Sequence, residues 1–266
     1  MNISSFFTSL TIILFFSTNV ALANEHAQLV RLKKAYPDFI THVQGNSLTW
    51  KNGEKENVND PQFRATSSSP SLSAQLNQPT YPPNSKIQCK KYIPMTDPGR
   101  TRNTAFFEKM YGNSKHAVEK NLVTIYWMPT YFAHRYPLRV TRINGVNMKL
   151  EKISTELESL VAKHPRYIQY LQNPGGTFYW REIENTARLS AHSYGIAIDI
   201  NSQHSNYWIW DTGIHSNKLN QHNHIPYKNH IPCAIVSIFE KNGFIWGGKW
   251  QHYDTMHFEY RPEMLN

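Results

Sequence analysis

The sequence predicts an α+β fold, in which a single main domain has a central antiparallel sheet flanked by helices and follows a loop-rich N-terminal extension. The chain has 266 residues, of which 40% are hydrophobic, and this is enough for a proper core. Short strand patterns alternate with helical patterns, and no internal repeat is visible. The 15 prolines and 12 glycines predict many loops. We place a leader at 1–23, the extension at 24–119 and the main domain at 120–266.

Residues 1–23 have the character of a secretory signal peptide. They contain no Lys, Arg, Asp or Glu, hold an apolar run at 10–16 and end in Ala21-Leu22-Ala23, which fits cleavage after Ala23. The alternative is an uncleaved anchor, but polar residues at 17–19 shorten the run below the roughly 18 to 20 apolar residues that a spanning helix needs. We therefore expect a periplasmic or secreted protein without stable membrane insertion after cleavage.

The extension begins with a short helix that Pro37 ends, followed by a hairpin arm at 47–50 before Asn52-Gly53. Residues 65–85 are rich in Ser, Pro, Gln and Asn, so we expect an extended loop or tether there. A turn and a helix follow at 97–112, with apolar residues on the inner side of the helix. We expect the whole extension to pack on the main domain.

The main domain opens with a strand at 122–128 that Pro129 ends. Residues 138–143 with Asn144-Gly145 predict a hairpin. Amphipathic spacing predicts helices at 148–163 and 232–242, the second with Pro232 in its first turn and Gly243 as its stop. Further strand patterns cover 177–183, 196–200 and 257–260.

The net charge and the cysteine content indicate the protein's partners and compartment, but not the reaction that it catalyses. The formal net charge of +9 lies wholly outside the leader and favours polyanionic partners such as cell-wall polymer, lipid head groups or nucleic acid. Cys89 and Cys233 are the two cysteines; in an oxidising compartment they form a disulfide or stay as two buried thiols. No C-x-x-C pattern is present, which argues against a redox or Cys-rich zinc role.

An aspartate inside an apolar strand pattern is the most informative feature of the chain. Asp199 alternates with three isoleucines at 196–200 and shares its strand face with small residues, which leave space beside the carboxylate. Burying that carboxylate is costly unless it is paired or binds a metal. With His192 and His257 it gives three nitrogen and oxygen ligands, which suit one Zn²⁺ ion with a position open for water. Asp254 would then be free to act on that water.

Each of these residues is weak evidence by itself, since the chain has 13 histidines. The order in which they occur along the chain is stronger evidence. The pattern Ser190-x-His192-x-x-Gly195-x-Ala197-x-Asp199, with Asp254-x-x-His257-Phe258-Glu259 later, resembles the zinc peptidoglycan peptidases of the VanY D-alanyl-D-alanine carboxypeptidase and L-alanyl-D-glutamate endopeptidase type. These are grouped with lysostaphin and hedgehog domains, so the resemblance implies a fold of that kind. It covers roughly residues 120–262.

Carried over residue by residue, the resemblance implies that the two histidines and Asp199 hold zinc and that Asp254 is the general base. Arg181 matches the arginine that precedes the first histidine and would stabilise the oxyanion or bind a substrate carboxylate; Arg188 competes for this role. Ser190 would orient a ligand or the turn. His252 either lines the substrate groove or is a bystander.

The resulting functional hypothesis is an exported zinc metallopeptidase, a peptidoglycan hydrolase that acts on peptide stems, and we expect it to be a monomer. The family's carboxypeptidases generally have glutamate where this chain has Asp254, so the aspartate favours the L-alanyl-D-glutamate endopeptidase type over a D-alanyl-D-alanine carboxypeptidase. The rival of another class is a zinc-stabilised, non-catalytic cell-wall-binding module. A nuclease using the histidines at 222, 224 and 230 is the third hypothesis; we expect a polar loop there and no nucleic-acid partner, because no acidic residue flanks them.

Overall fold

The computed structural model describes residues 25–66, 69–78, 81–82, 97–183, 188–214, 218 and 225–265. The predicted signal segment lies outside these residues. A helix at 25–35 comes first. The strands are β1 (Ile40–Gln44), β2 (Ser47–Trp50), β3 (Lys55–Asn57), β4 (Leu122–Tyr126), β5 (Pro137–Thr141), β6 (Ala197–Asp199), β7 (Phe244–Trp246) and β8 (His257–Tyr260). The α-helices are α2 (Leu72–Leu76), α3 (Thr104–Tyr111), α4 (Lys115–Glu119), α5 (Pro129–Phe132), α6 (Val146–Lys163), α7 (Ile168–Leu171), α8 (Trp208–Thr212) and α9 (Cys233–Lys241).

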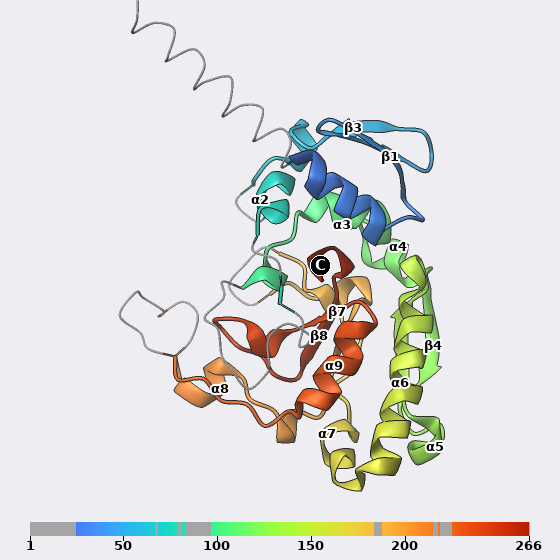
Figure 1. The fold of residues 1–266 in the computed structure, drawn as a ribbon, viewed down its shortest axis with the longest axis vertical. Helices are drawn as coiled ribbons and strands as arrows, with labels where there is room; N and C mark the ends of the chain where they lie inside the picture. Colours follow the sequence, from blue (N-terminus) through green and yellow to red (C-terminus); the bar gives the residue numbers. More distant parts are fainter. Residues whose placement is uncertain are drawn as a thin grey trace, which may run out of the picture.

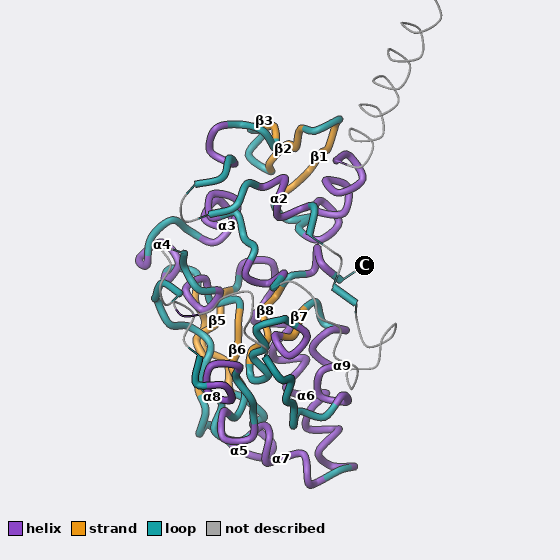
Figure 2. Tube along the Cα trace, turned by 90° about the vertical axis from the view of Figure 1, so that its left-hand side faces the viewer, coloured by secondary structure: helices purple, strands orange, loops and turns teal. Residues whose placement is uncertain are grey.

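The α+β class is confirmed, but the described strands form three small antiparallel sheets rather than one clear central sheet. β1–β2–β3 is an N-terminal meander, β4 pairs with β5, and β8 lies between β6 and β7. Figure 1 shows the first sheet and the first helix above the rest of the molecule, while α6 runs along one side. Figure 2 shows β6, β7 and β8 inside the lower part, with helices around them.

The β6–β8–β7 sheet is mostly buried and combines apolar residues with the polar side chains of the site. Ile196, Ile198 and Ile200 are fully buried, as the alternating pattern predicts. Phe258 of β8 stacks on Phe239 of α9, with ring centroids 3.9 Å apart. All four residues of β8 are buried, so the position of its side chains is set by packing on both faces.

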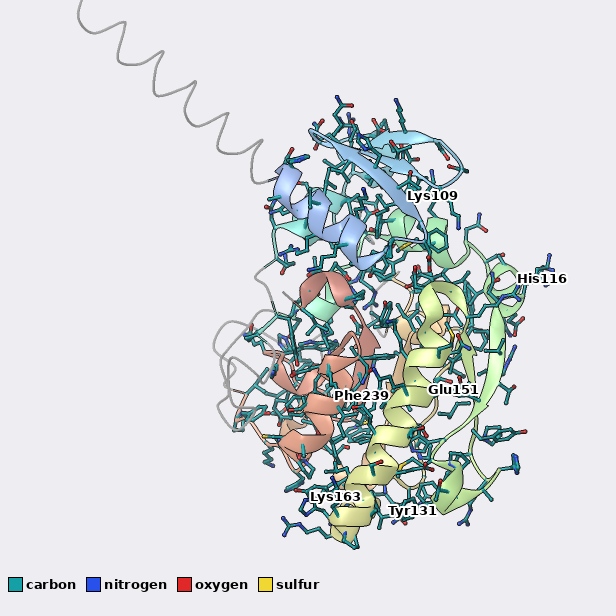
Figure 3. The ribbon with its side chains drawn as sticks, turned by 45° about the vertical axis from the view of Figure 1, so that its right-hand side comes forward. Lys109, His116, Tyr131, Glu151, Lys163 and Phe239 are labelled. Carbon is teal, nitrogen blue, oxygen red and sulfur yellow. The ribbon has the colours of Figure 1, made fainter. Side chains whose placement is uncertain are left out.

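The amphipathic helix α9 packs on this sheet, and α6 packs on α9 and on β4 and β5. The predicted helix at 148–163 is confirmed as α6, and that at 232–242 as α9, with Pro232 at the N-cap rather than in the first turn. Figure 3 marks Glu151 and Lys163 along α6 and Phe239 on the neighbouring α9. The hairpin predicted at Asn144-Gly145 is wrong: both residues have positive φ, but they lead into α6, while β5 pairs backward with β4.

Two further predictions about local structure are also wrong. The Ser/Pro-rich stretch at 65–85 is not merely a tether, because it contains α2, whose Leu72 and Leu76 are buried in the core. Residues 177–183 form no strand; a single bridge joins Glu182 to Leu189. No helix among the described residues is long and apolar enough to cross a membrane. Cys233 is disulfide-bonded, and Cys89 lies outside the described residues.

The N-terminal region and the C-terminal sheet share one hydrophobic cluster that reaches from Leu29 to Met264. Polar contacts cross it as well. Tyr36, just after the first helix, donates a hydrogen bond of 2.6 Å to Glu263, which pairs with Arg261 at 2.5 Å. Arg261 also pairs with Glu259 of β8 at 3.2 Å. These contacts connect the start of the described chain to the strand that carries His257.

Candidate metal and active site

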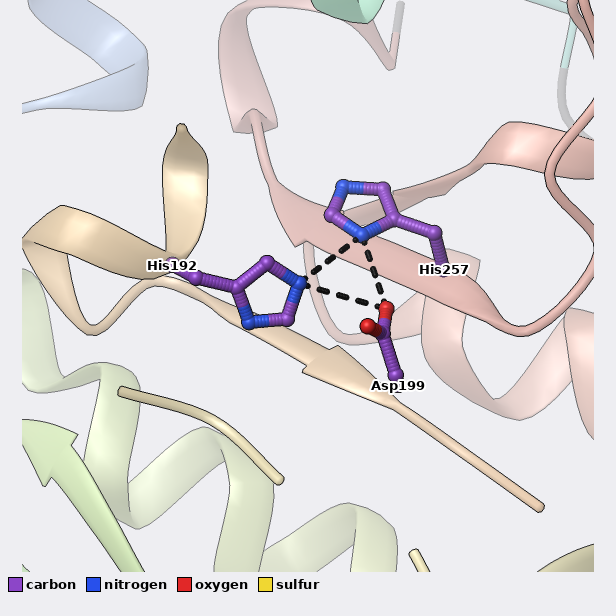
Figure 4. A group of neighbouring side chains, drawn as sticks. All are labelled: His192, Asp199 and His257. Atoms are coloured by element: carbon purple, nitrogen blue, oxygen red, sulfur yellow. Dashed lines mark hydrogen bonds and ion pairs between the residues drawn. The ribbon is translucent and has the colours of Figure 1, made fainter. Parts of the chain in front are cut away.

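Three elements bring the predicted metal ligands together. His192 lies in the 3₁₀ turn η6 (Ala191–Tyr194), Asp199 ends β6, and His257 begins β8. Asp199 and His257 are direct cross-strand partners, because β6 and β8 pair antiparallel in that register. Figure 4 shows the three side chains pointing toward one another from these separate elements.

The η6 turn explains the residues around His192. The Ser190 hydroxyl caps the turn by accepting a hydrogen bond from the His192 N–H at 3.3 Å. Gly195 closes the turn at a φ of 67°, and a Cβ there would approach Leu122 to 2.7 Å. The positive φ favours glycine, and a larger residue would also displace the Leu122 side chain and press on the backbone N of Thr141 at 3.1 Å. Ser190 also lines the cleft described below.

The ligand atoms form a nearly equilateral triangle. Nε2 of His192 lies 3.2 Å from Oδ1 of Asp199 and 3.1 Å from Nδ1 of His257, which lies 3.0 Å from the same carboxylate oxygen. In a tetrahedral zinc site with bonds of about 2.0–2.2 Å, ligand atoms are about 3.3–3.6 Å apart. The three atoms need to spread by only a few tenths of an ångström, so the residues fit zinc.

Hydrogen bonds on the far side of each ring fix the histidines for this role. His192 donates from Nδ1 to the carbonyl of Thr177 at 2.7 Å, which leaves Nε2 with a lone pair for a metal. His257 places Nε2 3.2 Å from Glu259, which leaves Nδ1 facing Asp199. Such outer partners orient a metal-binding imidazole and increase its basicity.

Glu259 is part of a buried ion-pair group that sequence reasoning did not find. Arg102 pairs with it at 3.0 Å and Arg261 at 3.2 Å. Burial would raise the pKa of Glu259, but the Arg102 charge, the His257 hydrogen bond and the Arg261 charge hold it at about 2. The carboxylate therefore stays ionised opposite the ring of His257.

Asp254 lies in the same cleft as the three ligands, at the entry to β8. Its N–H donates to the carbonyl of Gly247 at 3.0 Å, and an isolated bridge joins it to Tyr207. Burial and the charge of Asp199 raise the pKa of Asp254 to about 6. Its Oδ1 is buried and has no hydrogen-bond partner within the described structure, as an acceptor reserved for a bound group would be.

The cleft over this group has a volume of about 330 Å³. Arg181 lines it and is exposed at its edge. Arg188 is not part of the lining; its guanidinium donates to the carbonyl of Arg100 at 2.6 Å. Residues of α8 also line the cleft, and one of them, Trp210, is 62% exposed.

The remaining predicted residues lie elsewhere. His252 is not in the cleft lining; its Nδ1 pairs with Asp97 at 2.5 Å and its ring contacts Trp208. His222 and His224 lie outside the described residues, and His230 is exposed in a loop. Among the aromatic residues that flank the motifs, Tyr194 packs against Phe107 and Tyr111 in the core, whereas Trp250 lines the cleft.

Residues 184–260 match the model of a family described as D-alanyl-D-alanine carboxypeptidase. The match contains the three ligands and Asp254, and it confirms the resemblance to VanY-like zinc peptidases. No curated protein and no solved structure matches the chain. The match supports a peptidase, because the segment that carries these side chains is similar to the D-alanyl-D-alanine carboxypeptidase family. Arg100, Arg102 and Arg181 lie before the matched segment, so their roles depend on the structure alone.

Proposed function

We propose that the chain is an exported metallopeptidase that holds one zinc ion between His192, Asp199 and His257. It hydrolyses an amide bond in the peptide stems of peptidoglycan. The observation that carries this proposal is the ligand triangle with Asp254 beside it, inside a cleft that opens to solvent. The family match and the net charge of +9, which suits an anionic wall polymer, support the substrate class.

The division of labour follows from where each group lies. Bound zinc would supply Lewis acidity and lower the pKa of a coordinated water toward about 7. Asp254 is the group that would take a proton from the attacking water and deliver it to the leaving amine, since it is a buried carboxylate with an unused oxygen. Arg181, at the edge of the cleft, would stabilise the oxyanion of the tetrahedral intermediate.

We favour the L-alanyl-D-glutamate endopeptidase type, because the base position holds aspartate. The description of the matching family favours the D-alanyl-D-alanine carboxypeptidase alternative. Mass spectrometry of digested muropeptides separates them, since the new termini name the bond. Release of D-alanine alone would contradict the endopeptidase type, and a new D-glutamate amino terminus would contradict the carboxypeptidase.

The non-catalytic alternative is a zinc-stabilised wall-binding module. A binding module does not need a buried carboxylate beside its metal, and Asp254 occupies that position here. The same digestion tests this alternative: wall binding without any new termini at stoichiometric protein concentrations would contradict the peptidase proposal.

A further inference from the structure

A turn from the N-terminal region reaches the cleft. This is η3 (Pro98–Arg100), and it is fastened to the loop that leads to Asp254. Asp97 accepts a hydrogen bond of 2.9 Å from the N–H of His252 and pairs with the same residue's ring at 2.5 Å. Arg100 donates to the carbonyl of His252 at 3.3 Å. A Cβ at Gly99 would overlap the ring of Trp250, so only glycine permits this approach.

The guanidinium of Arg100 is held in place at the cleft wall. It lies over the ring of Trp250, 5.4 Å from the centroid, and that ring lies 5.5 Å from the ring of His257. Trp250 therefore contacts both Arg100 and His257, a candidate metal ligand. Arg188 donates to the backbone carbonyl of Arg100, which keeps a second cation close to the turn.

Arg100 differs from its neighbour Arg102 in what balances its charge. Arg102 forms an ion pair with Glu259 at 3.0 Å and donates a hydrogen bond to the carbonyl of Leu189 at 3.1 Å. Among the described residues, Arg100 forms no ion pair at contact distance; its charge acts on Asp97 and Asp254 without direct contact. Its Nε–H is buried without an acceptor. The Nε atom is closed to solvent, so an acceptor bound in the cleft would meet the Nη end of this guanidinium, which belongs to a residue of the cleft lining.

We propose that Arg100 binds a free carboxylate of the substrate next to the scissile amide and thereby selects acidic stem peptides. The two Nη atoms at the end of a guanidinium match a carboxylate in a bidentate pair. This inference rests on the proposed peptidase function. It makes Arg100 a specificity-determining residue and leaves Arg181 to the oxyanion.

The test uses two synthetic stem peptides that carry either a free carboxylate or a carboxamide beside the bond that the wild-type protein cuts. The zinc-loaded wild-type protein is expected to prefer the carboxylate peptide. Arg100→Gln is expected to lose about 10- to 100-fold in kcat/KM on that peptide, mainly through KM, and to change little on the carboxamide. Arg181→Gln is expected to lower kcat on both peptides.

Arg100→Lys and Arg166→Gln complete the set. The lysine keeps the charge without the fork and should retain an intermediate preference, while Arg166, exposed and outside the cleft lining, should leave the preference unchanged. Zinc content and thermal melting confirm that each variant is folded; if Arg100→Gln does not fold, Arg100→Lys decides. Equal preference in the wild type and the folded Arg100 variants overturns the inference, whereas failure of the wild type to cut either peptide overturns the proposed function instead.

Discussion

At the residue scale, the site is defined by which side chains have partners and which do not. His192 and His257 each use one ring nitrogen on an outer partner and turn the other inward. Asp254 has one carboxylate oxygen buried without a partner in the described structure. A set of fixed ligands beside an unsatisfied carboxylate is suited to activating a bound water.

Replacing Asp254 with Asn should separate metal binding from turnover. The ligand triangle does not include Asp254, so zinc content should remain near one ion per chain. Loss of the proton acceptor should lower kcat by about 10²- to 10⁴-fold. Glu151→Gln, at an exposed position of α6, is the matched control and should leave both quantities unchanged. Normal turnover by Asp254→Asn would refute its role as the base.

That His192, Asp199 and His257 lie together could be predicted from the sequence, because a buried carboxylate in an apolar strand has few explanations and the motif order indicated the two histidines. The contacts that hold the ring of His257 in place could not be predicted from the sequence. Arg102 precedes Glu259 by 157 positions, and no local pattern shows that two such distant residues pair. Similarly, only the structure distinguishes Arg102, which is fully paired, from Arg100.

At the element scale, the η6 turn sets the direction of His192. Its closing residue, Gly195, combines a positive φ with close contact to Leu122 on β4. A side chain larger than that of glycine at position 195 would therefore press against β4, on which the turn packs.

Gly195→Ala should destabilise the protein by about 2–4 kcal/mol, because strain from the positive φ adds to the clash. Gly213 is a matched control, since its φ is 69° and nothing lies within 4 Å of the point where an alanine Cβ would sit. Gly213→Ala should cost only about 1 kcal/mol. Urea unfolding measures both; equal losses would show that the contact with β4 does not matter.

The η3 turn should make stability depend on acid pH. Burial would raise the pKa of Asp97, but the His252 hydrogen bond and the Arg100 charge lower it below its usual value. A lowered folded pKa gives stability that is present above the unfolded pKa of about 4 and is lost as pH falls through the folded pKa. The difference in unfolding free energy between wild type and Asp97→Asn should therefore shrink below about pH 4. A difference that stays constant down to pH 2 would contradict this account.

Helices with a strong periodicity of apolar residues could be predicted from the sequence. Strands and turns whose form depends on a distant or neighbouring segment could not. The helix α6 has enough turns for its apolar stripe to be unambiguous. Residues 177–183 have strand composition but make only an isolated bridge, because their backbone hydrogen bonds go to the irregular segment 188–192 rather than to a regular strand. Asn144-Gly145 has the backbone of a hairpin turn, yet the residues after it are better helix formers and continue as α6.

At the scale of the whole molecule, the N-terminal region supports the site rather than standing apart from it. Composition made 65–85 look featureless, but Leu72, Leu76 and Tyr81 are buried in the shared core. The chain of contacts from Tyr36 through Glu263 and Arg261 to Glu259 ends at the ring of His257. Such long-range pairing cannot be read from local sequence.

Tyr36→Phe should therefore lower the free energy of unfolding of the N-terminal region and the site together. Losing the buried hydrogen bond to Glu263 should cost about 1–3 kcal/mol. Tyr131→Phe, at a residue 41% exposed, should change stability by less than about 0.5 kcal/mol. Tryptophan fluorescence and zinc release should report the same shifted urea midpoint. Zinc release that is unchanged while fluorescence shifts would contradict the coupling.

The most direct test of the central claim is cleavage of purified muropeptides by metal-free and zinc-restored protein, followed by mass spectrometry. Because His192, Asp199 and His257 offer the one described group able to hold a metal, chelation should abolish the new termini. One equivalent of zinc should restore them. Undiminished cleavage by protein shown to contain no metal would contradict the account.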